Sequence, residues 1–456
     1  MTNNSSPPDL IVIGGGLAGS EAALQAANCG LNVHLYEMRP ILSTGAHVTD
    51  YLAELVCSNS LGSNELFKAS GLLKKEMEIL GSEVLKIALE TTVPAGGALA
   101  VDRIAFAQGV TEKIISHPRI SLIRQEAPEI PNTPTIIASG PLTSLKLSNA
   151  IEQITGKQHL YFFDAISPIV SYDSIDMTIA FRGARYGIGS EEEGDYINCP
   201  MTQEEYDRFI DALLSAERIE LKEFERGIED GVRAGVDEYF EGCLPIEIMA
   251  KRGKESLAYG PMRPIGLTDR RNGKRSSAIV QLRQDNLSGS LYNIVGFQTN
   301  LTFKEQKKVF QMIPGLENAK FERFGQMHRN TFIFSPQLLE PTLQSKQRAD
   351  LFFAGQICGV EGYAGNIATG LLAGLNAARL LQNKSLLSLP KTSMLGALCY
   401  YITHADARDF QPMKANFGLF TPVGRQGKKK PGRKERGEIY AEIALRDLGA
   451  YLESQS

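Results

Sequence analysis

In the first forty residues, the spacing of hydrophobic positions changes from a strand-like pattern to a helical one and back to a strand-like pattern. Residues 10–13 (LIVI) form a short, wholly apolar run, which is typical of a strand buried on both faces of a parallel sheet. Residues 21–29 then carry apolar side chains at helical spacing, and residues 31–36 (LNVHLY) return to a strand-like pattern. The chain therefore opens with a predicted strand–helix–strand unit, in which Cys29 at the end of the helix is expected to lie in the core.

Glycines fill the turn between the first predicted strand and the helix. They match Gly-x-Gly-x-x-Gly, in which Gly14 permits the tight turn, Gly16 lets backbone approach a pyrophosphate and Gly19 lets helix and strand pack closely. Glu37 ends the second strand, 18 residues after Gly19, where a carboxylate can accept hydrogen bonds from ribose hydroxyls. The alternative is a glycine turn in another α/β sheet. The order of elements favours dinucleotide binding by a loop made of Gly14, Gly15, Gly16, Leu17, Ala18 and Gly19.

A second glycine-rich block lies near the other end of the chain. Residues 351–354 (LFFA) predict another buried strand, and residues 366–381 predict a helix of small residues. Between them, Gly355 and Gly362 would let the loop approach a flavin ring closely. The helix beginning at Asn366 would direct its N-terminus toward the ring edge where negative charge develops on reduction. A tightly packed helix without a ligand is the alternative, but two such blocks favour one long cofactor, FAD.

The remaining pattern divides the chain into three parts. Helical spacing is predicted over residues 65–89 and again over residues 97–116. We predict an α/β fold with a Rossmann-type, glutathione-reductase-like FAD-binding domain. Its first part spans residues 1–150, and its second part, with a basic C-terminal segment, spans residues 331–456. Residues 151–330 are predicted to form an inserted, mixed α/β substrate domain.

Composition narrows the class of protein. The 456 residues are 43% hydrophobic and 22% charged, and no apolar stretch reaches the roughly 18 residues that a membrane span needs. The N-terminal sequence MTNNSSPPD lacks the pattern of a signal peptide, which predicts a cytoplasmic protein. Six irregularly spaced cysteines without a Cys-x-x-Cys pair argue against a disulfide framework and against a zinc site.

Positive charge is concentrated in two stretches, although the formal net charge is −4. Residues 251–275 hold eight Lys or Arg and two acidic residues, and residues 424–436 hold seven and one. Either stretch alone is compatible with a solvated loop. Together they favour a nucleic-acid partner, because clustered cations neutralise phosphates and release counterions.

Two cysteines stand in sequences unlike a helix core. Cys57 lies in LVCSNS, a polar turn after apolar residues, and Cys243 lies in FEGCLP, between a glycine and a proline-containing turn. A nucleophilic thiol needs access and activation, which such positions can provide. The pattern alone does not separate this role from a structural one. Cys358, inside the second glycine block, is interpreted as structural.

The chain resembles the folate- and FAD-dependent tRNA uracil-5-methyltransferases over about residues 9–450. The motifs that carry the resemblance are IVIGGGLAGSEAA, ELVCSNSLGS, ALAVDR, FEGCLPIEIMAKRGKESLAYGPMRPIGL, RFGQMHRNTFI and GQICGVEGYAGNIATG. A sister family, the glucose-inhibited-division flavoproteins that modify the wobble uridine of tRNA, shares both glycine blocks. It carries a long additional helical region at the C-terminus, which this chain is too short to hold.

The resemblance implies a reaction. The family methylates C5 of the T-loop uridine of tRNA (position 54) to ribothymidine, taking the carbon from methylenetetrahydrofolate and electrons from NADH or NADPH through the flavin. Because C5 of uracil is a poor nucleophile, a thiolate must first add to C6. The two catalytic cysteines of the family match Cys57 and Cys243. We assign Cys243 to the attack on uracil and Cys57 to proton handling or protection of the one-carbon adduct beside the flavin, with the reverse assignment left open.

Other motif residues are candidates for substrate binding. His328, in GQMHRNTF, could stack on the folate ring, although a lone histidine is often structural. Arg263, in GPMRP, could hold the folate glutamate tail or an RNA phosphate. The basic stretches 251–275, which begins with Lys251 and Arg252, and 425–436 are the predicted surface for the tRNA T arm, recognised mainly by phosphate contact and shape.

Several rival functions are compatible with parts of this pattern. A wobble-uridine flavoenzyme would use the same blocks, and a small-molecule flavin oxidoreductase would turn over NAD(P)H without RNA. A non-catalytic flavoprotein that senses nucleic acid would tolerate loss of both cysteines. A methyltransferase using S-adenosylmethionine would have no need of the second glycine block. The sequence leaves the oligomeric state open.

Overall fold

The computed structural model describes most of the chain. The described residues are 7–44, 46–156, 160–165, 167–183, 185, 194–219, 244–325, 327–406, 410–422 and 431–455; for 160–165 and 327–330 only the course of the backbone is described.

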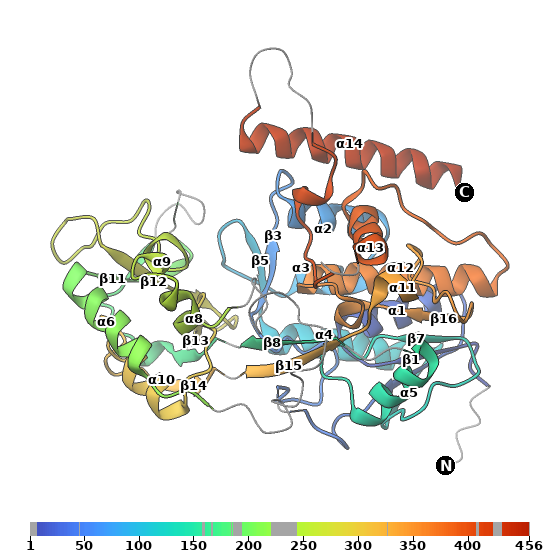
Figure 1. Cartoon of the computed structure of the whole chain (residues 1–456), viewed down its shortest axis with the longest axis horizontal. Helices are drawn as coiled ribbons and strands as arrows, with labels where there is room; N and C mark the ends of the chain where they lie inside the picture. The colour runs from blue at the N-terminus through green and yellow to red at the C-terminus, as the bar shows by residue number, and fades with distance from the viewer. Residues whose placement is uncertain are drawn as a thin grey trace.

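A five-stranded, wholly parallel sheet forms the centre of the larger lobe (Figure 1). Its strand order is β16 (Leu351–Phe353), β7 (Thr135–Ile137), β1 (Leu10–Ile13), β2 (Val33–Glu37) and β6 (Ile120–Arg124). β1 pairs with β2 on one side and with β7 on the other, so the direction of winding reverses beside it. In such sheets ligands bind outside the carboxyl ends of the strands at this reversal. Both glycine-rich blocks follow strands of this sheet, so the fold places them at one edge.

Two helices of small residues cover one face of the sheet and pack along each other: α1 (Leu17–Asn28) and α12 (Tyr363–Leu381). α1 begins at Leu17, four residues before the predicted start, because the chain enters helical geometry directly after the extended Gly16. The expectation that Cys29 is a core residue is wrong. Cys29 caps the C-terminus of α1 and is exposed, since the helix ends before its buried face would include this position.

The region after the first βαβ unit contains helices and a small sheet. α2 (Ala69–Ile79) and α3 (Glu83–Glu90) occupy the predicted helical stretch 65–89. The prediction of a helix over 97–116 is wrong at its start. Residues Ala98–Val101 form β5, the centre of an antiparallel sheet with β3 (Ser60–Ser63) and β4 (Thr92–Val93). The helix that follows, α4 (Arg103–Ser116), begins only where the Asp102 carboxylate accepts from the N–H groups of Ile104 and Ala105.

The smaller lobe is built on a six-stranded antiparallel sheet with its own hydrophobic core (Figure 1). The strand order is β10 (Phe181–Gly183), β11 (Tyr196–Met201), β12 (Ala278–Gln284), β13 (Leu291–Ile294), β9 (Ile169–Ser171) and β14 (Phe321–Arg323). The helices of this lobe include α6 (Gln203–Ser215), α8 (Ile246–Lys251), α9 (Ser256–Tyr259) and α10 (Phe303–Phe310). A two-stranded ribbon, β8 (Leu160–Ala165) with β15 (Met327–Phe332), lies between the lobes (Figure 1). Its strands are close to the predicted limits of the inserted domain, residues 151 and 330, and these limits stay a prediction.

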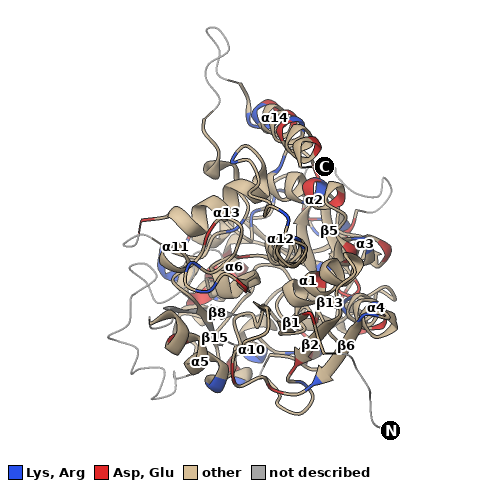
Figure 2. Ribbon diagram, turned by 90° about the vertical axis from the view of Figure 1, so that its right-hand side faces the viewer, with Lys and Arg blue, Asp and Glu red and all other residues tan. Residues whose placement is uncertain are grey.

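The C-terminal part of the chain returns to the larger lobe. α13 (Met394–His404) packs against α2, and α14 (Arg433–Ser454) lies across the outside of α2, with charged residues of both signs along its length (Figure 2). α5 (Leu145–Thr155) follows β7, and α11 (Ser335–Leu338) lies near α13. Within the described part of the chain, no helix combines the length and the apolar character that crossing a membrane requires.

Candidate cofactor and active site

One pocket of about 1000 Å³, including its open mouth, lies at the carboxyl edge of the parallel sheet. Residues from both glycine blocks line it, as the sequence predicted for a cofactor held by both. From the first block these are Gly14, Gly16, Leu17 and Ala18, and from the second Gly355, Gln356, Tyr363 and Asn366. The structure thus brings together segments more than 330 positions apart in the chain.

The glycines of the first block have distinct roles. A Cβ at Gly19 would lie 1.7 Å from the carbonyl oxygen of Gly14, so this position must be glycine for the loop and α1 to meet. Gly14 has a φ of +106°, which favours glycine, and its Cβ would also approach Ala138. Gly16, in contrast, faces open space, with no atom within 4 Å of a Cβ there. The pyrophosphate of a dinucleotide could therefore lie against Gly16.

Two helix N-termini converge on the pocket without side-chain caps. Gly16 precedes α1 and Gly362 precedes α12, and neither supplies a capping side chain. The first N–H groups of each helix have no partner within the helix, and the helix dipole adds partial positive charge. Such ends bind anionic groups. The α1 end would suit a pyrophosphate, and the α12 end a group that becomes anionic when reduced.

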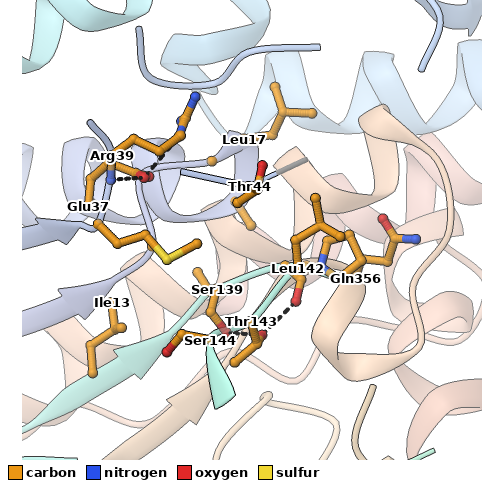
Figure 3. Close-up of a pocket in the computed structure, with 18 of the residues that line it drawn as sticks. Ile13, Leu17, Glu37, Arg39, Thr44, Ser139, Leu142, Thr143, Ser144 and Gln356 are labelled. Atoms are coloured by element: carbon orange, nitrogen blue, oxygen red, sulfur yellow. Dashed lines mark hydrogen bonds and ion pairs between the residues drawn. The ribbon is translucent and has the colours of Figure 1, made fainter. Parts of the chain in front are cut away.

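The Glu37 carboxylate lies at the end of β2, in the pocket (Figure 3). Oε2 accepts from the Gly15 N–H at 3.0 Å, and Oε1 accepts from the N–H and Nε of Arg39, each at 3.0 Å. Burial by itself would raise the pKa of Glu37, but the Arg39 charge and these hydrogen bonds outweigh it and the pKa is lowered. The carboxylate is therefore ionised and can accept from ribose hydroxyls, while it also holds the glycine loop.

Asn366 provides a polar atom in the pocket that has no protein partner. Its Oδ1 is buried and accepts no hydrogen bond within the described residues, although buried acceptors are nearly always paired. A donor on a bound cofactor would satisfy it. Together with the uncapped helix ends and the open space at Gly16, this unpaired acceptor fits a dinucleotide with a hydrogen-bonding ring system, such as FAD.

A third segment that lines the pocket was not among the predicted site residues. After β7 the chain passes through Ser139, Gly140, Leu142, Thr143 and Ser144, opposite Glu37 and Arg39 (Figure 3). The Ser139 and Thr143 hydroxyls share a hydrogen bond of 2.7 Å. The sequence signal is the predicted strand that ends in Ser139-Gly140, which resembles the strand-plus-glycine that closes many FAD-binding domains, although none of these residues was assigned to the site.

Cys57 lies beside the pocket. It is partly exposed, and its backbone N–H donates to the Tyr363 hydroxyl at 2.7 Å, at the first residue of α12. Its carbonyl oxygen accepts from Nη2 of Arg103 at 2.9 Å. Neither Tyr363 nor Arg103 was singled out from the sequence. Cys358 is buried, in accord with a structural role, and burial raises the pKa of its thiol.

Two predicted residues cannot be placed in detail. Cys243 lies outside the described residues; the chain is described again from Leu244, which is buried just before α8. His328 lies on β15, where its backbone pairs opposite Asp164, but its side chain is outside the described part. Just after β15, the Ile333 N–H donates to the carbonyl of Ile357, so this strand continues along the second glycine block.

The basic stretch 251–275 is not uniformly available for a partner. Arg271 forms ion pairs with Asp269 and Glu205, and Lys254 pairs with Asp211. The candidates at the end of α8, Lys251 and Arg252, are exposed. Arg263 is half-buried, and its Nε has no hydrogen-bond partner among the described residues. Of the segment 425–436, only residues 431–436 are described.

The parallel sheet, the two glycine blocks and the pocket between them define a two-lobed protein with a Rossmann-type dinucleotide site. A family model described as "Glucose inhibited division protein A" matches residues 9–385. A protein of Halalkalibacterium halodurans named methylenetetrahydrofolate–tRNA-(uracil-5-)-methyltransferase TrmFO is 56% identical over 443 residues, covering 97% of this chain and 98% of the relative. A protein of the same name from Bacillus licheniformis is 55% identical, covering 96% and 97%. The chain belongs to the glucose inhibited division protein A family and, within it, to the TrmFO group, which confirms the resemblance found in the sequence.

The fold comparison agrees. Aquifex aeolicus GidA, in its form II crystal, superposes with a TM-score of 0.66 at 16% identity, covering 98% of this chain and 76% of GidA. At this identity the match supports the fold alone. It confirms the predicted α/β fold class, a Rossmann-type domain accompanied by a second, mixed lobe.

Proposed function

We propose that this chain methylates C5 of uridine 54 in the T loop of tRNA, with methylenetetrahydrofolate as the carbon donor. The name shared by relatives that are 54–56% identical over nearly the whole chain is the observation that carries the proposal. The pocket supports it, because both glycine blocks line it and Cys57 lies beside it, hydrogen-bonded through its N–H to the lining residue Tyr363. Bound FAD, reduced by NAD(P)H, would supply the electrons that convert a methylene group to a methyl group.

The residues of the chain have separate tasks in this proposal. Gly14, Gly15, Gly16, Leu17, Ala18, Gly19, Glu37, Gly355, Gly362 and Asn366 would hold FAD. Cys243 would add through its thiolate to C6 of uracil, which makes C5 nucleophilic toward the one-carbon unit. A base would then remove the proton from C5, and the thiolate would leave C6 as the bond breaks. Cys57, beside Tyr363, would handle protons or shield the one-carbon unit. His328 would stack on the folate ring. Lys251 and Arg252 would contact the T arm of the tRNA, and Arg263 would contact either the T arm or the folate tail. The reaction would take place in the cytoplasm.

The first experiment supplies purified protein with unmodified tRNA transcript, methylenetetrahydrofolate and NADPH, followed by nucleoside mass spectrometry. Ribothymidine that requires the folate, and that is absent from a transcript with cytidine at position 54, is expected. If another modified uridine formed at the wobble position, the chain would be a wobble-uridine flavoenzyme. If NADPH were consumed without any change in RNA, a small-molecule oxidoreductase would be the better assignment.

Covalent trapping tests the roles of the cysteines. With tRNA that contains 5-fluorouracil, we expect the wild type and Cys57→Ser to form a covalent complex with the RNA. Cys243→Ser should form no covalent complex. Cys29→Ser is the matched control, because Cys29 is exposed at the end of α1. A complex with Cys243→Ser but not with Cys57→Ser would reverse the assignment.

A further inference from the structure

The backbone around Cys57 is held from both sides by side chains of distant elements. On the pocket side, the Cys57 N–H donates to the Tyr363 hydroxyl at 2.7 Å. On the other side, the Arg103 guanidinium donates to the carbonyl oxygens of Cys57 (Nη2, 2.9 Å) and Leu55 (Nη1, 2.5 Å). Because the N–H and C=O of Cys57 are both held in this way, the position of its backbone and the direction of its Cα–Cβ bond are fixed.

Arg103 is itself fixed by an acidic residue of the other lobe. Its Nε donates to both carboxylate oxygens of Asp285, at 3.0 and 2.8 Å, and Asp285 lies directly after β12. Both side chains are largely buried. Burial disfavours the charged form of Arg103, but the charge and hydrogen bond of Asp285, together with contributions from Tyr363 and Cys57, outweigh this effect, so the pKa of Arg103 is raised. A buried charge pair of this kind costs desolvation and requires precise geometry, which suits a positioning role.

A second set of hydrogen bonds joins the Cys57 segment to the smaller lobe. Asn59 is fully buried, and its Nδ2 donates to the carbonyls of Val101 and Gln284, each at 2.9 Å. Its Oδ1 accepts from Nε of Arg283 at 2.9 Å. The Leu287 N–H donates to Asp102 at 2.8 Å. The segment that carries Cys57 is thereby attached to the end of β12 in the six-stranded sheet as well as to the pocket.

We propose that Arg103, held by Asp285, is a positioning residue that fixes the Cys57 segment between the cofactor pocket and the inserted lobe. Its effect on catalysis rests on the proposed function, whereas its effect on the Cys57 backbone does not. Displacement of a reacting group by about 1 Å can lower a rate by about 100-fold. Arg103 therefore acts on turnover through Cys57, without touching a substrate.

The test uses the paired variant Arg103→Gln/Asp285→Asn, which removes both buried charges together. The matched control is Arg348→Gln/Asp350→Asn. Arg348 likewise joins a carboxylate (Asp350, 2.8 Å) to a backbone carbonyl (Thr133, 2.9 Å), but at the start of β16, at the end of the sheet opposite the pocket. Two measurements are made: the steady-state kinetics of tRNA methylation, which give kcat and KM, and hydrogen exchange of the peptide that spans residues 55–59.

For the Arg103 pair we expect kcat to fall between about tenfold and 100-fold, KM for tRNA to stay within about threefold, and amide exchange in residues 55–59 to accelerate at least fivefold. The control pair should change neither. Unchanged exchange at residues 55–59 in a variant that still binds FAD would overturn the proposal, as would a rise in KM with kcat intact. If wild-type protein methylated no tRNA, the exchange measurement would still decide the matter.

If the paired variant fails to fold, a second variant, Arg103→Lys, tests the same proposal. Arg103→Lys keeps a charge opposite Asp285 but cannot reach both carbonyls, so it should show the same faster exchange at residues 55–59. If Arg103→Lys also failed to fold, Arg103 would serve overall stability and the positioning role would be wrong.

Discussion

The two glycine-rich blocks line one pocket, but they use their glycines differently. In the first block, Gly14 and Gly19 allow the loop and the start of α1 to approach each other, and Gly16 faces open space. In the second block, Gly355 and Gly362 adopt positive φ beside the pocket, whereas Gly370 and Gly374, in the middle of α12, face α1. The helix of the second block is thus packed on the helix of the first. The comparison teaches that a glycine-rich block can have two functions: in the second block, the glycines before α12 face the pocket, and those in the middle of α12 allow close helix packing.

The largest effect should come from a glycine at this helix contact. A Cβ at Gly370 would lie 2.2 Å from the carbonyl oxygen of Ala18, a backbone atom that cannot move aside without separating α1 from α12. Gly370→Ala should lower the free energy of unfolding by about 4 kcal/mol and, as a consequence, impair FAD binding. Urea unfolding of the apoprotein measures this.

The control for that variant is Gly449→Ala, in the interior of α14 with no atom within 4 Å of the new Cβ. It should be neutral or stabilise by about 0.5–1 kcal/mol, since alanine is the better helix former. If Gly370→Ala behaved like Gly449→Ala, the packing role given to the second block would be wrong.

A pH dependence of stability is expected from the elements that support the second block. Glu76 of α2 is fully buried and accepts from the N–H groups of Met394 (2.6 Å) and Leu395 (2.8 Å) at the start of α13. Burial raises the pKa of Glu76 to about 7, against the opposing effect of these hydrogen bonds. A raised folded-state pKa gives stability that is complete below about pH 4.5 and is lost as pH rises through 7. The loss should be about 3 kcal/mol.

The measurement compares urea unfolding of wild type and Glu76→Gln between pH 5 and 8. The difference between the two proteins should change with pH, because glutamine does not titrate. Glu78→Gln, at a half-exposed position of the same helix, is the matched control and should leave the pH profile unchanged. A constant difference between wild type and Glu76→Gln would show that Glu76 is ionised over the whole range.

These contrasts also show what the sequence could predict. The first block was predictable because its requirements are local: a turn, a close approach and a helix start within six positions, each demanding a residue type. The same holds for the strands that precede both blocks. The fold class followed from these local units, and the comparisons with known proteins agree with it.

The contacts around Cys57 were not predictable in this way. Cys57 and Tyr363 are 306 positions apart, and Asn59 and Gln284 are 225 apart. No periodic pattern marks a hydrogen bond between such positions, because it depends on how the lobes pack. The wrong prediction that Cys29 lies in the core has a related cause. Helical spacing indicates a face, but not the residue at which the helix leaves the core.

A smaller effect is expected where the first block faces open space. Gly16 has a φ of −74°, which alanine adopts readily, and no atom lies within 4 Å of a new Cβ. Gly16→Ala should therefore leave apoprotein stability within about 0.5 kcal/mol of wild type. The methyl group would occupy space needed by the cofactor, and FAD affinity should fall about tenfold, or about 1.4 kcal/mol. Fluorescence titration with FAD measures the affinity. A loss of stability as large as that of Gly370→Ala would erase the distinction between ligand-facing and packing glycines.

The smallest effect should come from Asn366, and it should have opposite signs in the two measurements. Asn366→Leu removes the buried, unpaired Oδ1, so the apoprotein should be as stable as wild type or more stable. FAD should bind about fivefold more weakly, the value of one hydrogen bond of about 1 kcal/mol. The control lies on the same helix: buried Asn376 donates to the carbonyls of Thr342 and Leu387 and accepts from the Leu387 N–H. Asn376→Leu should cost about 1–3 kcal/mol of stability, because it leaves those partners unpaired. Equal destabilisation by both substitutions would mean that Asn366 serves the protein interior and that the second block recognises the cofactor by other groups.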